Sequence, residues 1–349
     1  MAFNASSTAT EVAQALSKAI RGRTVLITGV SPNSIGAATA FAIASQQPER
    51  LILASRTKKN IDAVVADIKS SFPSASIDEL LLDLSSLKSV RAAAANLNTR
   101  ITKLDILINN AGIMALPTRQ LSEDGIEMQF ATNHVGHFLF TNLILDTLRT
   151  AARENGPGQT RIINISSNGH RFSPVRFDDV NFDGVPVPSE QQPDVETLTK
   201  RIGKIDWQDG YEKFVSYGQS KTANILFSLY LREQLAKSGV LSFSVHPGTI
   251  VTNLIRNMVG STVSASPIQF VMKSGTLTGR YKTFDGGAAT SIYAAFENSL
   301  HGNTGIYLED CGVGTPAVHA TKMEDAERLW KLSELLVGEE FPIHKDISE

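Results

Sequence analysis

Tyr217 and Lys221 are residues whose types and spacing could carry out chemistry. They lie four positions apart, and Ile225 and Leu229 continue the apolar pattern of a helix, so both side chains should point from one helix face. An ammonium beside a phenol favours the phenolate and should lower the phenol pKa from its ordinary value of about 10. The pair therefore predicts a general acid and base, although the same spacing also occurs by chance on many helices.

A glycine-containing turn follows the strand predicted at 24–28. Gly29 and Gly36 flank small polar residues that lead into a helix, and such a turn binds phosphate through free backbone N–H groups and the helix dipole. Ser34 stands where a further glycine is usual, and the turn is one residue longer than the common pattern. The sequence predicts a phosphate site here, with a purely structural turn as the alternative.

Arg56 follows the next predicted strand, 51–54, and no acidic residue stands at that strand end. In dinucleotide sites an acidic residue at this point favours a free ribose 2′-hydroxyl, whereas an arginine accommodates a 2′-phosphate. The sequence therefore predicts NADP(H) rather than NAD(H), with a solvent-exposed basic helix start as the alternative.

Strands and helices must alternate to position these residues, and the pattern predicts a doubly wound parallel sheet, a three-layer α/β/α Rossmann fold in a single domain. The predicted strands are 24–28, 51–54, 77–82, 104–108, 161–165, 241–245 and 305–308. The predicted helices are 57–71, 86–101, 121–150, 214–239, 285–298 and 323–337. Polar residues cluster at successive strand ends, where such sheets bind ligands: Asp83, 109–112, Ser166 and Ser167.

Residues 1–22 form an N-terminal arm in which Thr8 and Glu11 predict a capping box, and 23–349 form the catalytic domain. Residues 168–214 are rich in Pro, Asp and Gly and too long for an ordinary connection. We expect an insertion with some local structure near the site, or else a surface loop without a catalytic role.

Apolar residues, two methionines among them, are mixed with small residues over 253–283, which suits a lid above a nonpolar ligand. His246 ends a predicted strand beside a Pro-Gly turn, and we expect a strand-end histidine rather than a catalytic base.

Composition limits the partners. The 349 residues are 42% hydrophobic and carry a formal net charge of -2, which gives no electrostatic reason to expect nucleic acid. The single cysteine, Cys311, excludes an internal disulfide and fits a reducing compartment. The N-terminus has no signal-peptide pattern and no long apolar run is present, so we expect a cytoplasmic chain without a membrane span; organelle targeting stays open.

The motifs together resemble the short-chain dehydrogenase/reductase family. They are Thr28-Gly29 with Ile35-Gly36, Asp83-Leu84, Asn109-Asn110-Ala111-Gly112, Asn133 in NHVGHF, Ser166-Ser167, Tyr217 with Lys221, and Pro247-Gly248 with Thr252. The segments YGQSKTANILF, HPGTIVTNL and TGIYLEDC are similar to the retinol-dehydrogenase-like branch, which includes plant chloroplast members. The segment 168–214 is longer than in that branch, so the substrate does not transfer.

The resemblance implies roles for single residues. Tyr217 is the acid or base, Lys221 holds the ribose and lowers the tyrosine pKa, Ser167 binds the carbonyl, and Asn133 joins the proton relay. Cofactor contacts are implied for Gly29, Ile35 and Gly36 at the pyrophosphate, Arg56 at the 2′-phosphate, Asp83 and Leu84 at the adenine, Asn110, Ala111 and Gly112 near the adenosine ribose, and Ile250 and Thr252 at the nicotinamide carboxamide. No metal is expected.

The resulting hypothesis is an NADPH-dependent carbonyl reductase, or alcohol dehydrogenase in reverse, acting between CH–OH and C=O groups. Its substrate would be a largely nonpolar ketone or aldehyde, or a polyketide-like molecule of secondary metabolism. The alternatives are a non-redox step such as dehydration, isomerisation or cyclisation on the same fold, and a non-catalytic NADP(H) sensor. The resemblance also allows a homodimer through helices 121–150 and 214–239, although the branch includes monomers.

Overall fold

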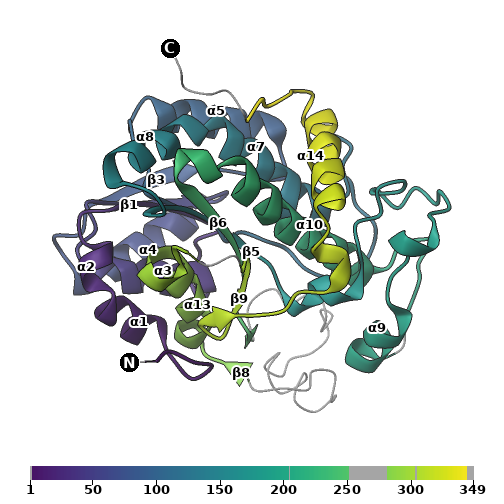
Figure 1. The fold of residues 1–349 in the computed structure, drawn as a ribbon, viewed down its shortest axis with the longest axis horizontal. Helices are drawn as coiled ribbons and strands as arrows, with labels where there is room; N and C mark the ends of the chain where they lie inside the picture. Colours follow the sequence, from purple (N-terminus) through teal and green to yellow (C-terminus); the bar gives the residue numbers. More distant parts are fainter. Residues whose placement is uncertain (1, 204, 251–280, 303–304, 344–349) are drawn as a thin grey trace.

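The computed structural model describes residues 2–203, 205–250, 281–302 and 305–343, and within them an eight-stranded sheet lies between two layers of helices (Figure 1). The strand order is β10-β9-β6-β5-β4-β1-β2-β3. The strands are β1 Thr24–Thr28, β2 Arg50–Ser55, β3 Ile77–Leu81, β4 Ile106–Asn109, β5 Thr160–Ile165, β6 Val240–His246, β9 Tyr307–Glu309 and β10 Gly312–Val313. Among the strands that the structure describes in this sheet, only the β9–β10 pair is antiparallel, so the predicted doubly wound fold is confirmed.

Strand β1 is buried along its whole length, as its continuous apolar and β-branched residues require. It pairs with β2 on one side and β4 on the other, for example Ile27 with Leu53 and with Ile108. The chain therefore winds away from β1 in both directions. The crevice beyond the carboxyl ends of β1 and β4 is where this topology binds ligands.

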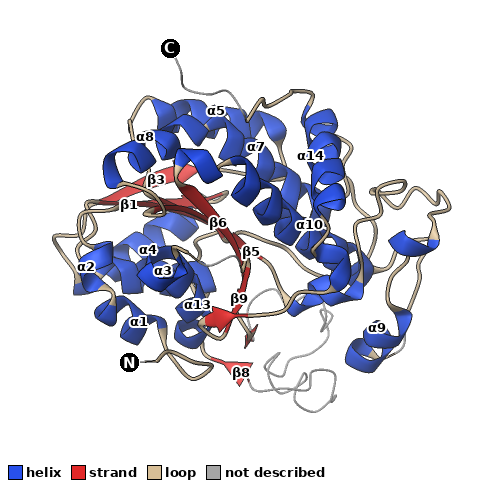
Figure 2. Cartoon of the chain, viewed as in Figure 1, coloured by secondary structure: helices blue, strands red, loops and turns tan. Residues whose placement is uncertain are grey.

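Helices cover both faces of the sheet (Figure 2). One apolar cluster joins the sheet to α1 Ala9–Ala15, α3 Ile35–Ala44, α4 Lys58–Ser71 and α13 Phe284–Phe296, with α2 Ser17–Ile20 alongside. The other cluster joins it to α5 Leu87–Asn98, α7 Gly136–Leu143, α8 Leu145–Asn155, α10 Lys213–Gln234 and α14 Met323–Val337. The predicted capping box of α1 is present, since Thr8 Oγ1 accepts from Glu11 N and Thr8 N donates to the Glu11 carboxylate.

The helix predicted at 121–150 is wrong in its first turns and in its continuity. Leu121 pairs with Glu127 in a short bridge, and the helix begins with α6 Met128–Phe130, where the Glu127 carboxylate accepts from Phe130 N. A π-helical turn, Ala131–Val135, then leads into α7. Apolar spacing alone predicts one continuous helix over 121–150. It detects neither the Glu127 cap that starts the helix nor the wider π-helical turn.

Residues 168–214 contain a 3₁₀ turn, Asn168–Phe172, and helix α9, Val195–Ile202. The predicted lid, 253–283, lies outside the described residues except at its end, where β8 Tyr281–Lys282 pairs with β7 Thr249–Ile250. No described helix combines the length and the hydropathy needed to cross a bilayer. Among the described residues no group of three His, Cys, Asp or Glu side chains could hold a metal ion.

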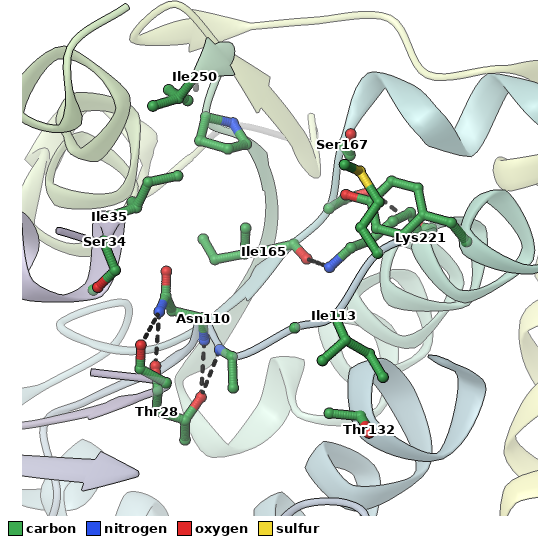
Figure 3. Close-up of a pocket in the computed structure, with 18 of the residues that line it drawn as sticks. Thr28, Ser34, Ile35, Asn110, Ile113, Thr132, Ile165, Ser167, Lys221 and Ile250 are labelled. Atoms are coloured by element: carbon green, nitrogen blue, oxygen red, sulfur yellow. Dashed lines mark hydrogen bonds between the residues drawn. The ribbon is translucent and has the colours of Figure 1, made fainter. Parts of the chain in front are cut away.

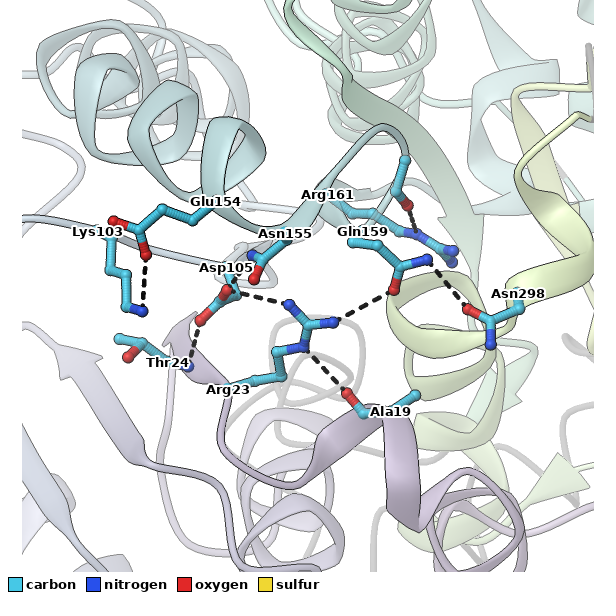
Figure 4. A network of polar contacts seen from close by, with 11 residues as sticks. Ala19, Arg23, Thr24, Lys103, Asp105, Glu154, Asn155, Gln159, Arg161 and Asn298 are labelled. Carbon is cyan, nitrogen blue, oxygen red and sulfur yellow. Dashed lines mark hydrogen bonds and ion pairs between the residues drawn. The ribbon is translucent and has the colours of Figure 1, made fainter.

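A polar network joins the strands at the edge opposite the ligand-binding crevice (Figure 4). Asp105, which is buried, accepts from Thr24 N at 2.7 Å and pairs with Arg23 at 3.3 Å. Arg161, also buried, donates to the backbone oxygens of Gly158 and Ala294. These contacts satisfy polar groups at the starts of the strands, so we assign them a structural role in the sheet.

Candidate active site

Helix α10 carries Tyr217 and Lys221 on one face, as their spacing predicts. The Glu212 carboxylate caps the helix by accepting from Phe214 N and Val215 N, both at 2.7 Å. Tyr217 is 7% exposed and Lys221 is 3% exposed, and Lys221 Nζ lies 5.7 Å from the centre of the tyrosine ring. The two side chains are thus adjacent and withdrawn from bulk water.

Burial, rather than the neighbouring charge, controls both groups. It raises the pKa of Tyr217 to about 12, which a hydrogen bond with Ser167 only partly offsets. It also lowers the pKa of Lys221 to about 7. The expected lowering of the tyrosine pKa by Lys221 is therefore wrong for this structure, because desolvation disfavours both charged forms and Lys221 Nζ donates instead to Ile165 O at 3.0 Å.

The two serines after β5 point in different directions. Ser166 Oγ donates to the backbone oxygen of Lys221 at 2.8 Å, away from the cavity. Ser167 Oγ accepts from Gly169 N at 3.0 Å and bonds the Tyr217 side chain. The second serine of the pair, as predicted, therefore stands beside the tyrosine hydroxyl.

Asn133 lies in the π-helical turn and clamps the segment after β4. Its Oδ1 accepts from Ile113 N at 2.8 Å, and its Nδ2 donates to Ile113 O and to Ser220 Oγ. A Cβ built on Gly112 would lie 3.2 Å from Asn133 Oδ1 and 3.4 Å from Lys221 Nζ. Asn133 and Lys221 thus meet at Gly112, although the Asn133 amide is already bonded to the Ile113 backbone and to Ser220 Oγ.

His137 is a buried residue that the sequence motifs did not single out. Thr28 Oγ1 accepts from Asn110 N and Ala111 N at 3.0 Å each, so its hydroxyl hydrogen is left to donate to His137 Nε2 at 2.8 Å. The other ring nitrogen, Nδ1, then carries hydrogen and donates to Asn133 O at 3.1 Å. Burial lowers the pKa of His137 to about 4, which keeps this neutral tautomer. The sequence signal that could have identified His137 is its position four residues after Asn133.

The turn after β1 approaches the neighbouring strand end so closely that only glycine fits. Gly29 has φ +73°, and a Cβ there would lie 2.4 Å from Ala111 Cα. A Cβ on Gly36 would lie 2.6 Å from Asn110 Nδ2. This leaves a shallow cradle at the start of α3, where the first helical turn has free N–H groups.

Ser34 explains the departure from the common glycine pattern. Its Oγ accepts from Ala37 N at 3.1 Å and donates to Ser31 O at 2.7 Å, so it is the N-cap of α3. Asn110 Nδ2 donates to Thr28 O at 2.8 Å and ties the segment after β4 to the same turn. The extra residue is thus part of a defined helix start.

Arg56 lies exposed at the far end of the crevice, with Asp83 and Leu84 nearby in the same lining. Lys58 is committed to Asp62 and Glu79, at 2.5 and 2.8 Å, whereas Arg56 forms no ion pair within the described part of the chain. Asp83 Oδ1 accepts from Ser85 N and Ser85 Oγ. Arg56 therefore has its guanidinium available for an anionic group.

A cavity of about 650 Å³ connects these positions. Ser34 and Ile35 lie on one side, Ser167 and Lys221 on the other, and Asn110 between them (Figure 3). The predicted site residues in its lining are Gly29, Ile35, Gly36, Arg56, Asp83, Leu84, Asn110, Ala111, Gly112, Ser167, Tyr217, Lys221 and Ile250. Asn133 lies behind it, and Thr252 lies outside the described residues.

These residues fit an extended dinucleotide. The cradle at Gly29 and Gly36 suits a pyrophosphate. At the other end, Lys221 Nζ donates to one acceptor among the described residues, Ile165 O, so its remaining N–H groups can donate to ribose hydroxyls. Met114, Phe172, Ile202 and Phe214 also line the cavity; the sequence motifs did not identify them because apolar residues carry no positional signal.

Comparisons with known proteins agree with this geometry. The family description short chain dehydrogenase matches residues 23–176. Short-chain dehydrogenase TIC 32 B, chloroplastic, of Brassica napus is 38% identical over 337 residues, covering 96% of this chain and 94% of that protein. Retinol dehydrogenase 13 of Homo sapiens is 36% identical over 330 residues, covering 93% of this chain and 87% of that protein. A crystal structure from Mycobacterium paratuberculosis, 27% identical, has a TM-score of 0.63 and covers 93% of this chain and 96% of that one.

Fold and site together define an oxidoreductase of the Rossmann type that uses a nicotinamide cofactor. The chain belongs to the short-chain dehydrogenase/reductase family, in its retinol-dehydrogenase-like branch.

Proposed function

We propose that the protein is an NADPH-dependent carbonyl reductase that acts on a largely nonpolar ketone or aldehyde. The adjacent hydroxyls of Tyr217 and Ser167, in one cavity with Lys221 and the turn at Gly29, carry the proposal. Arg56, at the strand end where an acidic residue would favour NAD(H), supports the phosphorylated cofactor.

The site residues have separate tasks. NADPH, when bound, supplies the hydride. Ser167 donates a hydrogen bond to the carbonyl oxygen, and Tyr217 gives its phenolic proton to that oxygen as the alcohol forms. Lys221 would hold the ribose hydroxyls of the bound cofactor. Because burial raises the pKa of Tyr217 to about 12, the phenol stays protonated near neutral pH, which supports the reductive direction.

Apolar side chains around the hydroxyl pair support a nonpolar substrate. Met114, Phe172 and Phe214 line the cavity beside Tyr217. A polyketide-like molecule of secondary metabolism would suit this lining. We propose an intracellular location. The Brassica napus relative is named as chloroplastic, so an organelle is as compatible with this proposal as the cytoplasm.

Substitution of Tyr217 by Phe tests the proposal. Loss of the hydroxyl should lower kcat for carbonyl reduction at least 100-fold, in the range of general acid catalysis. The dissociation constant for NADPH, measured by fluorescence titration, should stay within about threefold, because the hydroxyl bonds Ser167 rather than the cofactor cradle.

The products separate this function from its alternatives. Oxidation of NADPH with formation of an alcohol supports the reductase. Product without nicotinamide oxidation would indicate dehydration, isomerisation or cyclisation, and tight NADPH binding without any product would indicate a sensor. A Tyr217→Phe protein with undiminished rate would contradict the assigned acid.

A further inference from the structure

We propose that helix α9 forms the far wall of the substrate pocket and that Ile202 selects substrates with an apolar extension beyond the carbonyl group. The proposal rests on the proposed carbonyl reductase function and adds the residue that decides substrate size and polarity. Helix α9 belongs to the long segment between Ser167 and Tyr217, which projects at the right of Figure 1.

The core of this segment is also the wall of the cavity. An apolar cluster contains the buried residues Ala115, Phe172, Phe182, Leu198, Tyr211, Phe214 and Val215, with Met114, Ile202 and Ile205 packed against it. Four of its members, Met114, Phe172, Ile202 and Phe214, line the same cavity as Ser167 and Tyr217. Of these four cavity-lining residues, Ile202 is the one that lies on α9.

Helix α9 is oriented by its two faces. Leu198 is fully buried, and Ile202 lies four residues later on the same face. The exposed pair of Glu196 and Lys200 lies on the other side of the helix and faces solvent, and Val195, at the first position of the helix, is 55% exposed. The apolar face is therefore held against the pocket.

The start of α9 is hydrogen-bonded to the 3₁₀ turn that follows Ser167. Asp194 Oδ1 accepts from Thr197 N at 2.9 Å and caps the helix. Asp194 N donates to Phe172 O at 3.2 Å, at the end of the 3₁₀ turn that follows Ser167. The helix and the carbonyl-binding serine are thus connected within a few residues.

The preceding part of the segment is hydrogen-bonded to helix α10. Arg176 and Asp179 form a buried ion pair at 2.9 Å. Gln219, which lies between Tyr217 and Lys221 on α10, accepts from Arg176 N and donates to Val180 O, both at 2.9 Å. These bonds fix the start of α9 relative to Tyr217, and Ile202 packs against the apolar cluster that contains Phe172 and Phe214.

This wall favours one class of substrate. Met114, Phe172, Ile202 and Phe214 carry no charged group and no side-chain hydrogen-bond donor. A polar substituent that reached them would lose its water without gaining a partner, whereas an alkyl or aryl group would be favoured by burial. Ketones with a long alkyl or aryl arm should therefore react better than short or hydroxylated ones.

A series of n-alkyl methyl ketones of increasing chain length, with NADPH, measures the selection. Ile202→Asn should lower kcat/KM for the longest ketones roughly tenfold or more, and Ile202→Ala by a smaller factor, since differences of one methylene are worth about 10-fold or more in apolar pockets. The shortest ketone and the NADPH dissociation constant should change less than twofold. The matched control is Val195→Asn, at the exposed first position of the same helix, which should leave every value unchanged.

An equal loss for short and long ketones, or no loss for either, would overturn the proposal. Calorimetric binding of the longest ketone to the NADP⁺-loaded protein keeps the wall testable without turnover. If the unmodified protein reduces no ketone, the reductase function fails on its own. Weaker ketone binding in Ile202→Asn but not in Val195→Asn would then still support the wall, and equal binding in all three proteins would exclude it.

Discussion

At the scale of single residues, the site depends on buried groups whose pKa values are shifted by burial. Burial shifts the pKa of both Tyr217 and Lys221 toward the neutral form, because it disfavours the charged form of each group. His137 stays neutral in one tautomer and links Thr28 to Asn133. Hydrogen-bond geometry therefore defines the site more than charge does, and the exposed Arg56 is the exception.

Replacement of Arg56 by Ala tests cofactor choice. The KM for NADPH should rise about tenfold or more, because a hydrogen bond between charged groups contributes about 1.5–3 kcal/mol. The KM for NADH, which has no 2′-phosphate, should stay within about twofold. Lys58→Ala is the control, since Lys58 is already paired with Asp62 and Glu79. Equal effects on both cofactors would exclude the phosphate contact.

Replacement of Gly169 by Ala should misplace the catalytic hydroxyls. The new Cβ would lie 2.7 Å from Tyr217 Cε1, so the ring or the loop has to shift. We expect kcat to fall by about tenfold to 100-fold, since small misplacements at a reacting centre have effects of this size. NADPH affinity should hardly change. Gly302→Ala, where nothing lies within 4 Å, is the steady-state kinetic control; an unchanged kcat in Gly169→Ala would contradict the close packing.

At the scale of elements, helix α10 is held from both sides. The insertion bonds its first turns through Gln219, and α14 covers its outer face together with α7. The Trp330 ring of α14 stacks on Tyr230 of α10 at 4.5 Å and meets Phe138 of α7 at 4.8 Å. Trp330 thus occupies part of the surface of α7 and α10, the helices through which the family resemblance allows a homodimer.

Truncation of Trp330 to Ala should therefore weaken the whole layer. Trp330 is 4% exposed, and we expect the free energy of unfolding to fall by about 3–5 kcal/mol, as for other buried aromatic side chains. Urea denaturation followed by circular dichroism measures the change. Leu335→Ala, on the same helix but 78% exposed, should alter stability by less than about 0.5 kcal/mol. Similar losses in both variants would mean that α14 does not support the layer through Trp330.

At the scale of the whole molecule, stability should depend on pH through buried histidines. Burial lowers the pKa of His134 and of His170 to about 3, and that of His137 to about 4. Below pH 6.5 the unfolded chain binds protons that the folded chain does not, so their stabilising contribution is complete above pH 6.5 and is lost as pH falls toward 4. Buried Glu127, whose pKa burial raises, acts in the opposite direction.

The free energy of unfolding should thus be lower at pH 5 than at pH 7, with each histidine contributing on the order of 1–2 kcal/mol. Denaturant titrations at a series of pH values measure the difference. His134→Leu should reduce the slope of the free energy of unfolding against pH by the equivalent of about one proton. The reason is that His134 contacts Phe130, Phe227 and Ser333 in the interior. A stability that is flat between pH 7 and 5 in the unmodified protein would show that these histidines are protonated without unfolding.

The order of strands and helices could be read from the sequence because it is written in local patterns. The continuous apolar run at Thr24–Thr28 became a strand buried throughout, and the spacing of Tyr217 and Lys221 placed both on one helix face. Polar residues at strand ends, such as Asn110 and Ser167, met in one cavity because parallel strands end at the same edge.

Only the tertiary structure decided the electrostatics and the surroundings of that cavity. The pKa of Tyr217 rises because of burial, which depends on residues far apart in the chain. The hydrogen bonds of His137, the cover that α14 gives to α10, and the place of Ile202 in the pocket wall are likewise contacts between distant segments. Local spacing determines which residues share a face, but desolvation and long-range packing determine what that face meets.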